Sequence, residues 1–165
     1  MEDGTLAVIF WLWALASSKF DITKEAETPG LTFAYGETFV DREKNGSELR
    51  FIWHRDHRFG PLQPTIDVSF THRGGAYIGA GFRQEAHLGG PFYLSGQAVT
   101  GLWLDDLLGN DEDLGGLIEF RTGFALEADL GDGRVAVGWD HRSNADLGRI
   151  NPGLEVLSVR YTMRY

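Results

Sequence analysis

Apolar and polar residues alternate with a period of two along most of the chain after Gly30. From Ile118 to Leu130 every second residue is apolar or Thr, and the residues between them include Glu119 and Arg121. Successive side chains of a β-strand point to opposite faces, so such a run predicts a strand with one apolar face. Polar or Gly-rich turn segments separate the runs. The expected strands are Leu31–Val40, Ser47–His54, Gln63–His72, Ala76–His87, Pro91–Leu104, Gly116–Leu130, Arg134–Asn144 and Leu154–Tyr165.

This pattern predicts an all-β fold, an eight-stranded antiparallel up-and-down barrel. A soluble barrel places its apolar face inside, whereas a membrane barrel turns that face to lipid and fills its lumen with polar side chains. The polar face mixes Gly with opposite charges, which suits the narrow lumen of eight strands. The runs also reach the roughly 9–11 residues that a tilted, membrane-spanning strand requires. We therefore expect a transmembrane barrel, and a soluble barrel that carries an apolar ligand is the alternative.

The segment before the barrel contains an unbroken apolar run, Leu6–Ala16. It is too short to span a bilayer as a helix, which takes about 20 residues. Its length and its small-x-small end resemble a secretory signal, although Met1–Thr5 is acidic instead of basic. We expect residues 1–30 to be a signal-like apolar segment with a polar lead-in and residues 31–165 to be the barrel domain. A misassigned start codon and an uncleaved interfacial helix are the alternatives.

Composition narrows the range of functions. The net charge is −9, with 24 acidic and 15 basic residues and no long basic run, so a nucleic-acid partner is not expected. The absence of Cys excludes disulfides, thiolate nucleophiles and Cys-ligated metals. Structural or surface roles are expected for four isolated histidines, His54, His57, His72 and His87. Two roles are open for four arginines: they could contact lipid phosphates as bidentate donors, or they could lie on a solvated rim of the barrel. These are Arg50, Arg55, Arg58 and Arg73.

Three residues near the C-terminus have the chemistry of an acyl-transfer site. His141 and Ser143 are two positions apart in one expected strand, so they share a face, and Glu155 has the matching parity in the next strand. A nucleophile, a base and a carboxylate that orients the base are the parts of a catalytic triad. All three fall on the apolar face, where ionisable residues are costly and indicate function. The alternative is that they only solvate the ends of their strands.

Two motifs in this region carry a family resemblance: His141-x-Ser143-Asn144-Ala145 and Asn151-Pro152-Gly153-Leu154-Glu155. They resemble the C-terminal signature of the lipid A 3-O-deacylase family. Members of that family are eight-stranded outer-membrane barrels with the active site on the lipid-facing wall. The resemblance is sharp over the last two expected strands, loose over the other strands and absent up to about Gly30.

The resemblance implies that Ser143 is the nucleophile, that His141 is the general base and that Glu155 orients His141. It implies that Asn144 shapes the oxyanion hole or the loop and that Asn151 holds the loop. The implied substrate is the ester-linked acyl chain at the 3-position of lipid A in lipopolysaccharide, and no metal or cofactor is expected.

The implied location is the outer membrane of a Gram-negative bacterium, so the outer-membrane bilayer surrounds the barrel. Whether the chain forms a homodimer is open. The sequence departs from the signature at Asp146, where a small residue, often Gly, is expected. A non-enzymatic outer-membrane barrel and a phospholipase-like esterase on the same scaffold are the alternative functions.

Overall fold

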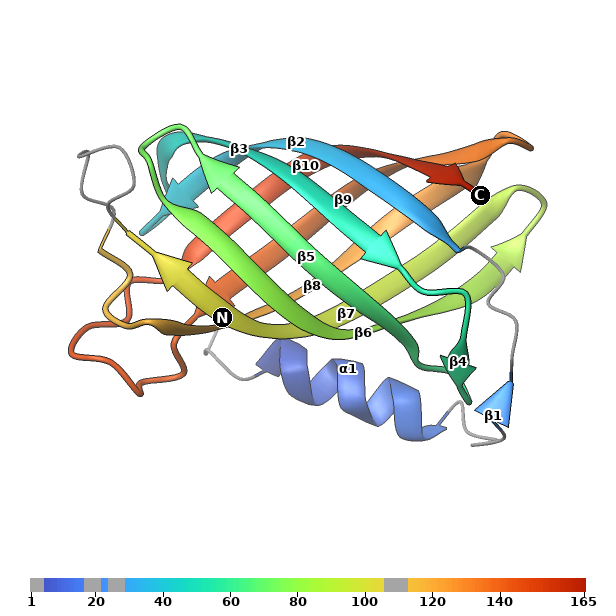
Figure 1. The fold of residues 1–165 in the computed structure, drawn as a ribbon, viewed down its shortest axis with the longest axis horizontal. Coiled ribbons are helices and arrows are strands. Elements are labelled where there is room, and N and C mark those ends of the chain that lie inside the picture. Colours follow the sequence, from blue (N-terminus) through green and yellow to red (C-terminus); the bar gives the residue numbers. More distant parts are fainter. Residues whose placement is uncertain (1–4, 17–21, 24–28, 106–112) are drawn as a thin grey trace.

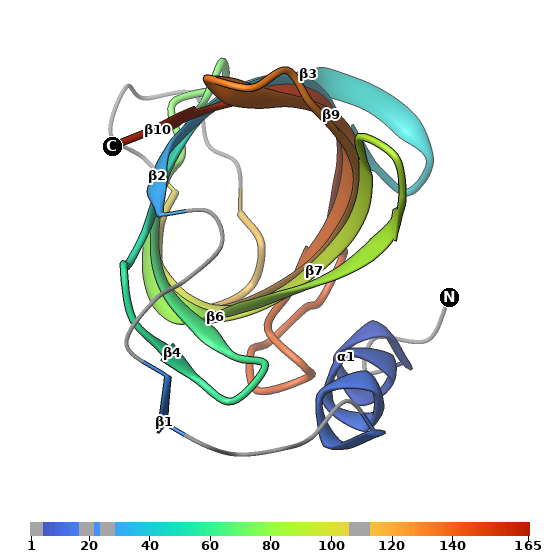
Figure 2. The same ribbon diagram turned by 90° about the vertical axis from the view of Figure 1, so that its right-hand side faces the viewer.

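The computed structural model describes residues 5–16, 22–23, 29–105 and 113–165. Within these residues, eight antiparallel strands close into a barrel in the order β10-β2-β3-β5-β6-β7-β8-β9 (Figures 1 and 2). Closure pairs the first barrel strand with the last, so the barrel leaves no strand edge open to lipid. The strands are β2 (Gly30–Val40), β3 (Glu43–His54), β5 (Gln63–Thr71), β6 (Ala76–Gly89), β7 (Phe92–Leu104), β8 (Ile118–Asp129), β9 (Gly133–Ser143) and β10 (Leu154–Arg164).

The eight predicted strands and the barrel are confirmed, and the apolar faces point outward. Val159 on β10 is 66% exposed, and Val137 and Leu126 on the two preceding strands are also exposed. An apolar band of this extent around a barrel is the surface that lipid covers. The alternative of a soluble barrel with an apolar interior is therefore wrong.

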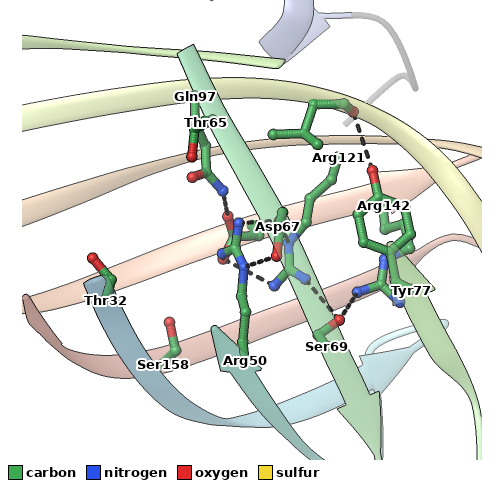
Figure 3. A network of polar contacts seen from close by, with 12 residues as sticks. Thr32, Arg50, Thr65, Asp67, Ser69, Tyr77, Gln97, Arg121, Arg142 and Ser158 are labelled. Atoms are coloured by element: carbon green, nitrogen blue, oxygen red, sulfur yellow. Dashed lines mark hydrogen bonds and ion pairs between the residues drawn. The ribbon is translucent and has the colours of Figure 1, made fainter. Parts of the chain in front are cut away.

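The lumen of the barrel is filled by paired charges (Figure 3). Arg50 donates through Nε and one terminal nitrogen to Asp67, at 2.8 and 2.5 Å, and through the other to Asp140 at 3.0 Å. Arg160 and Arg121 also donate to Asp140, at 2.6 and 3.4 Å. Charges taken out of water are tolerated when each has hydrogen-bonded counter-charges, as these have. An interior cavity beside this network has a volume of about 10 Å³, so the lumen is a packed core.

The structure shows that the lipid-phosphate role is wrong for one arginine and that two histidines have the expected structural or surface roles. Arg50 is 1% exposed inside the lumen, so a contact with lipid phosphates is wrong for it. His54 is also in the lumen and shares a 2.8 Å hydrogen bond with the Thr32 hydroxyl. His57 is exposed and lies 2.6 Å from the Asp56 carboxylate, and this hydrogen bond lowers the pKa of Asp56. Both histidines thus have the structural or surface roles expected of them.

The apolar run near the N-terminus forms helix α1 (Thr5–Ala16), which lies on the outer wall of the barrel (Figure 2). Phe10 and Ala14 face the barrel and are buried, whereas Val8 and Leu12 are exposed on the opposite side. No helix in the described ranges is both long enough and apolar enough to cross a membrane. Beyond α1, the two-residue strands β1 (Ile22–Thr23) and β4 (Arg58–Phe59) pair with each other outside the barrel.

Candidate active site on the barrel wall

The pairing of the last two strands brings the three candidate catalytic residues together. β9 and β10 are antiparallel, and their register places Glu155 directly opposite His141. Residues directly opposite each other in such a pair have Cβ atoms about 4.5–5.5 Å apart. Ser143 lies two residues further along β9, roughly 7 Å from His141 on the same face. His141 is therefore the neighbour of both Ser143 and Glu155, as a base between a nucleophile and a carboxylate must be.

The three residues lie on the outer face, at the end of β9 that leads into the 145–153 loop. The intervening residue Arg142 points into the lumen, so His141 and Ser143 point outward. The His141 ring stacks on that of Trp139, the preceding outward residue, with centroids 6.5 Å apart and an interplanar angle of 29°. On the other side of β9, β8 places Thr122 opposite His141. The site is thus built on the closed sheet, near one rim of the barrel and away from the middle of the membrane.

Arg142 anchors the strand segment between the two candidate residues. Its guanidinium donates to Glu48 at 2.5 Å and to the Ser69 hydroxyl at 3.1 Å (Figure 3). It also lies over the rings of Tyr77 and Trp103, at 4.6 and 4.8 Å from their centroids. These contacts hold β9 from the inside while its outer face carries the candidate chemistry. Sequence reasoning missed this role, although the parity already marked Arg142 as the lumen-facing residue between them.

Asn144 and Asn151 hold the loop that follows β9. The Asn144 side-chain amide donates to the carbonyl oxygens of Leu114 and Ile150, at 2.9 and 2.6 Å. The Asn151 side chain accepts from the Asn144 backbone N–H and donates to the Asp146 carboxylate, both at 3.1 Å. Both hydrogens of the Asn144 amide are therefore used within the loop.

A tight turn immediately after Ser143 explains why Gly is expected at position 146, where this chain has Asp. The Leu147 N–H donates to the Asn144 carbonyl at 3.0 Å, and the two residues between them, Ala145 and Asp146, have φ values of 52° and 61°. Two consecutive positive φ angles are those of a type I′ turn, which favours Gly and Asn. Asp tolerates this region better than most residues but less well than Gly. The residue at 146 thus occupies a backbone position where Gly is the least strained choice.

Ser143 also borders an apolar hollow on the outer wall, with a volume of about 390 Å³. Pockets that bind small molecules have volumes of roughly 300–1,000 Å³. The hollow extends over β8, β7 and β6, and the polar side chains at its β9 end are those of Ser143 and Thr122. It is otherwise lined by small side chains and by aromatic ones, including Ala80, Ala98, Thr100, Phe82, Phe120 and Trp11.

Fold and site together define a class of protein: an eight-stranded membrane barrel that carries a serine, a histidine and a glutamate side by side on its lipid-facing wall. The model of the lipid A 3-O-deacylase (PagL) family matches residues 30–164. The chain belongs to this family, and it is an outer-membrane barrel of a Gram-negative bacterium. No curated protein matches the chain.

Solved structures with a similar fold are barrels of the same kind. The outer membrane enzyme PagL is similar with a TM-score of 0.61 and 19% identity, over 82% of this chain and 99% of that one. Neisserial surface protein A is similar with a TM-score of 0.60 and 13% identity, over 82% and 94%. A de novo designed transmembrane β-barrel has a TM-score of 0.51 and 7% identity, over 84% and 99%. Because all three sequence identities are below 25%, these structural similarities establish the fold alone.

Proposed function

We propose that the chain is a serine esterase that removes the ester-linked acyl chain at the 3-position of lipid A. The observation that carries this proposal is the β9–β10 register, which sets Glu155 opposite His141 while Ser143 shares the face of His141. Membership of the deacylase family supports the choice of reaction. The apolar hollow beside Ser143 supports an acyl chain as the group that is bound.

In the proposed mechanism, His141 accepts the hydroxyl proton of Ser143 while the Ser143 oxygen attacks the ester carbonyl carbon. Glu155 holds the imidazole in one orientation and stabilises its protonated form. The bond to the sugar oxygen breaks, and that oxygen takes the proton from His141. A water molecule, deprotonated by His141, then attacks the acyl-serine, and its hydrolysis releases the fatty acid and restores Ser143.

The oxyanion donors in this proposal are backbone groups. The Asn144 amide hydrogens are used by two loop carbonyls, so we assign Asn144 to loop support together with Asn151. In the turn after Ser143, the N–H groups of Asn144 and Leu147 have partners within the loop. The N–H groups of Ala145 and Asp146 are the donors we propose for the developing negative charge. One such donor contributes about 3–4 kcal/mol in other hydrolases.

The test is the mass of lipid A after incubation of lipopolysaccharide with the refolded barrel. We expect the wild type to remove one hydroxyacyl chain, and Ser143→Ala or His141→Ala to lower the rate by about 10⁴-fold or more. His87→Ala serves as the control, because His87 is exposed in the β6–β7 hairpin at the opposite rim and bonds only locally to the Gly90 carbonyl at 2.9 Å. If both site variants release the chain as fast as the wild type, the assignment is wrong.

The same assay separates the alternative functions. A phospholipase-like esterase would release fatty acid from phospholipid vesicles faster than from lipopolysaccharide, again through Ser143. A non-enzymatic barrel would release nothing from either lipid. A homodimer stays a prediction, which sedimentation of the detergent-solubilised chain would test.

A further inference from the structure

One carboxyl group of the lumen is not bonded into the charge network. Glu119 of β8 is 0% exposed, and neither of its carboxyl oxygens has a hydrogen-bond partner among the residues that the structure describes. Arg142 of β9 lies opposite Arg121 and is therefore a diagonal neighbour of Glu119, but it donates to Glu48 instead. The other carboxyl groups of this part of the lumen accept from arginines, so Glu119 needs another explanation.

The surroundings of Glu119 on the β7 side are apolar. The β7–β8 register places Gly101 directly opposite Glu119, and the lumen-facing residues on either side of it are Val99 and Trp103, each 3% exposed. The Tyr77 ring of β6 fills the space over the glycine, since a Cβ atom added at Gly101 would lie 2.7 Å from its Cζ atom. A buried carboxyl without a bonded counter-charge is more stable neutral, and the neutral form has an O–H to donate.

The acceptor for such a donor is on β9. The β8–β9 ladder ends with Phe120 opposite Ser143, so the next residues along the two strands are Glu119 and Asn144. Cβ atoms of such a pair are about 4.5–5.5 Å apart. Asn144 is 0% exposed and uses both amide hydrogens, but its Oδ1 atom has no hydrogen-bond partner in the described part of the chain. One proton between the two side chains would satisfy both.

We propose that Glu119 is protonated, that it donates a hydrogen bond to Asn144 Oδ1, and that it thereby positions the turn after Ser143. The inference rests on the proposed esterase function. Asn144 begins the turn whose next two N–H groups, those of Ala145 and Asp146, are the proposed oxyanion donors. Glu119 is inside the barrel and does not touch the substrate, so it is a positioning residue. When it loses its proton, a carboxylate faces the amide oxygen and the turn is no longer held.

The other groups that face Glu119 do not compete for this role. Arg121 and Arg142 keep their charge throughout the accessible pH range. Glu48 is bonded to both of them, at 2.6 and 2.5 Å. The Tyr77 hydroxyl donates to the Val99 carbonyl at 3.4 Å. The buried residues at this end of the lumen on β2, β5 and β10 have no ionisable side chain; they are Thr38, Ser69, Thr71, Leu154 and Val156.

The test is the rate of acyl release from lipopolysaccharide between about pH 6 and about pH 10, with the full chain refolded in detergent. We expect the wild-type rate to rise as His141 loses its proton and to fall at alkaline pH as Glu119 ionises. Glu119→Gln retains an N–H donor at every pH, so it should match the wild type at neutral pH within about threefold and lack the alkaline fall. Glu119→Leu has no donor and should be about 10- to 100-fold slower at every pH.

Glu85→Gln is the matched control. Glu85 is a lumen carboxylate near the opposite rim, 2.9 Å from Arg83 and 2.7 Å from Arg134. This variant should keep the alkaline fall of the wild type. The proposal is overturned if Glu119→Gln shows the same alkaline fall as the wild type, or if Glu119→Leu is as fast as the wild type.

Infrared spectroscopy detects the proton without any reaction. At neutral pH the wild type and Glu85→Gln should show the carbonyl stretch of a protonated carboxyl group, and Glu119→Gln should lack it. A wild type without this band would overturn the proposal even if it is an active esterase. If the band is present but no acyl chain is released from any lipid, the esterase function fails and the protonation of Glu119 stands.

Discussion

At the scale of single residues, the site depends on the face of its strand on which each side chain lies. His141, Ser143 and Glu155 share the outer face, and the register of two strands sets the histidine between the other two. Small residues in the adjoining loop matter for the same geometry. Gly153 has a φ of 70°, and a Cβ atom there would lie 3.0 Å from the Cε1 atom of His141.

Glu155→Gln should lower the rate of acyl release less than Ser143→Ala does. The carboxylate orients the imidazole and stabilises its charge, but it does not itself bond to the substrate. In other serine hydrolases, loss of the carboxylate costs about 10⁴-fold, and loss of the nucleophile about 10⁶-fold. Single-turnover rates on lipopolysaccharide for the two variants would check the order. Equal losses would mean that Glu155 has another role.

Gly153→Ala should lower the rate by about 10- to 100-fold, because it displaces the His141 ring and small misplacements of catalytic groups are costly. Gly131→Ala is the matched control. Gly131 also has a positive φ, 97°, but a Cβ atom there would have nothing within 4 Å. Both variants carry backbone strain, so both should lose similar stability to urea. If they also lose the same fraction of activity, the contact with His141 does not matter.

At the scale of the elements, β9 links the lumen to the outer wall. Its inward residues Asp140 and Arg142 join the buried charge network, and its outward residues His141 and Ser143 form the candidate site. The lumen contacts therefore set the position of the strand that carries the nucleophile and the base. Strand β10 depends on the same network through the ion pair between Arg160 and Asp140.

Arg142→Met should lower the free energy of unfolding by about 3–5 kcal/mol, because it leaves Glu48 without one of its counter-charges inside the barrel. Arg149→Met is the control. Arg149 is exposed and lies 3.7 Å from Asp113, and a surface pair of this kind contributes less than about 1 kcal/mol. Urea unfolding in vesicles would measure both. A loss below 1 kcal/mol for Arg142→Met would mean that the network does not stabilise β9.

At the scale of the whole molecule, closure of the barrel separates two environments. The strands put paired charges inside and apolar side chains outside, so the molecule inverts the arrangement of a water-soluble protein. The candidate site opens on the outer side, toward the bilayer that contains the proposed substrate. A soluble esterase would have to extract each lipid from the membrane, whereas this site meets it there.

The chain should fold only in detergent or in a bilayer. Its outer wall is apolar around the full circumference, and in water such a surface drives aggregation. Size-exclusion chromatography with and without detergent would check this expectation. A monodisperse, folded chain in plain buffer would contradict the membrane orientation of the apolar face.

The sequence by itself determined the number of strands, their approximate bounds and the face of each residue, because the two-residue period of a strand is a local property. It also marked His141, Ser143 and Glu155 as sharing one face. Only the tertiary structure decided which charges meet in the lumen, because these pairs depend on barrel closure. Arg50 and Asp140 bond across 90 residues of chain, and Asn144 bonds to Leu114 across 30.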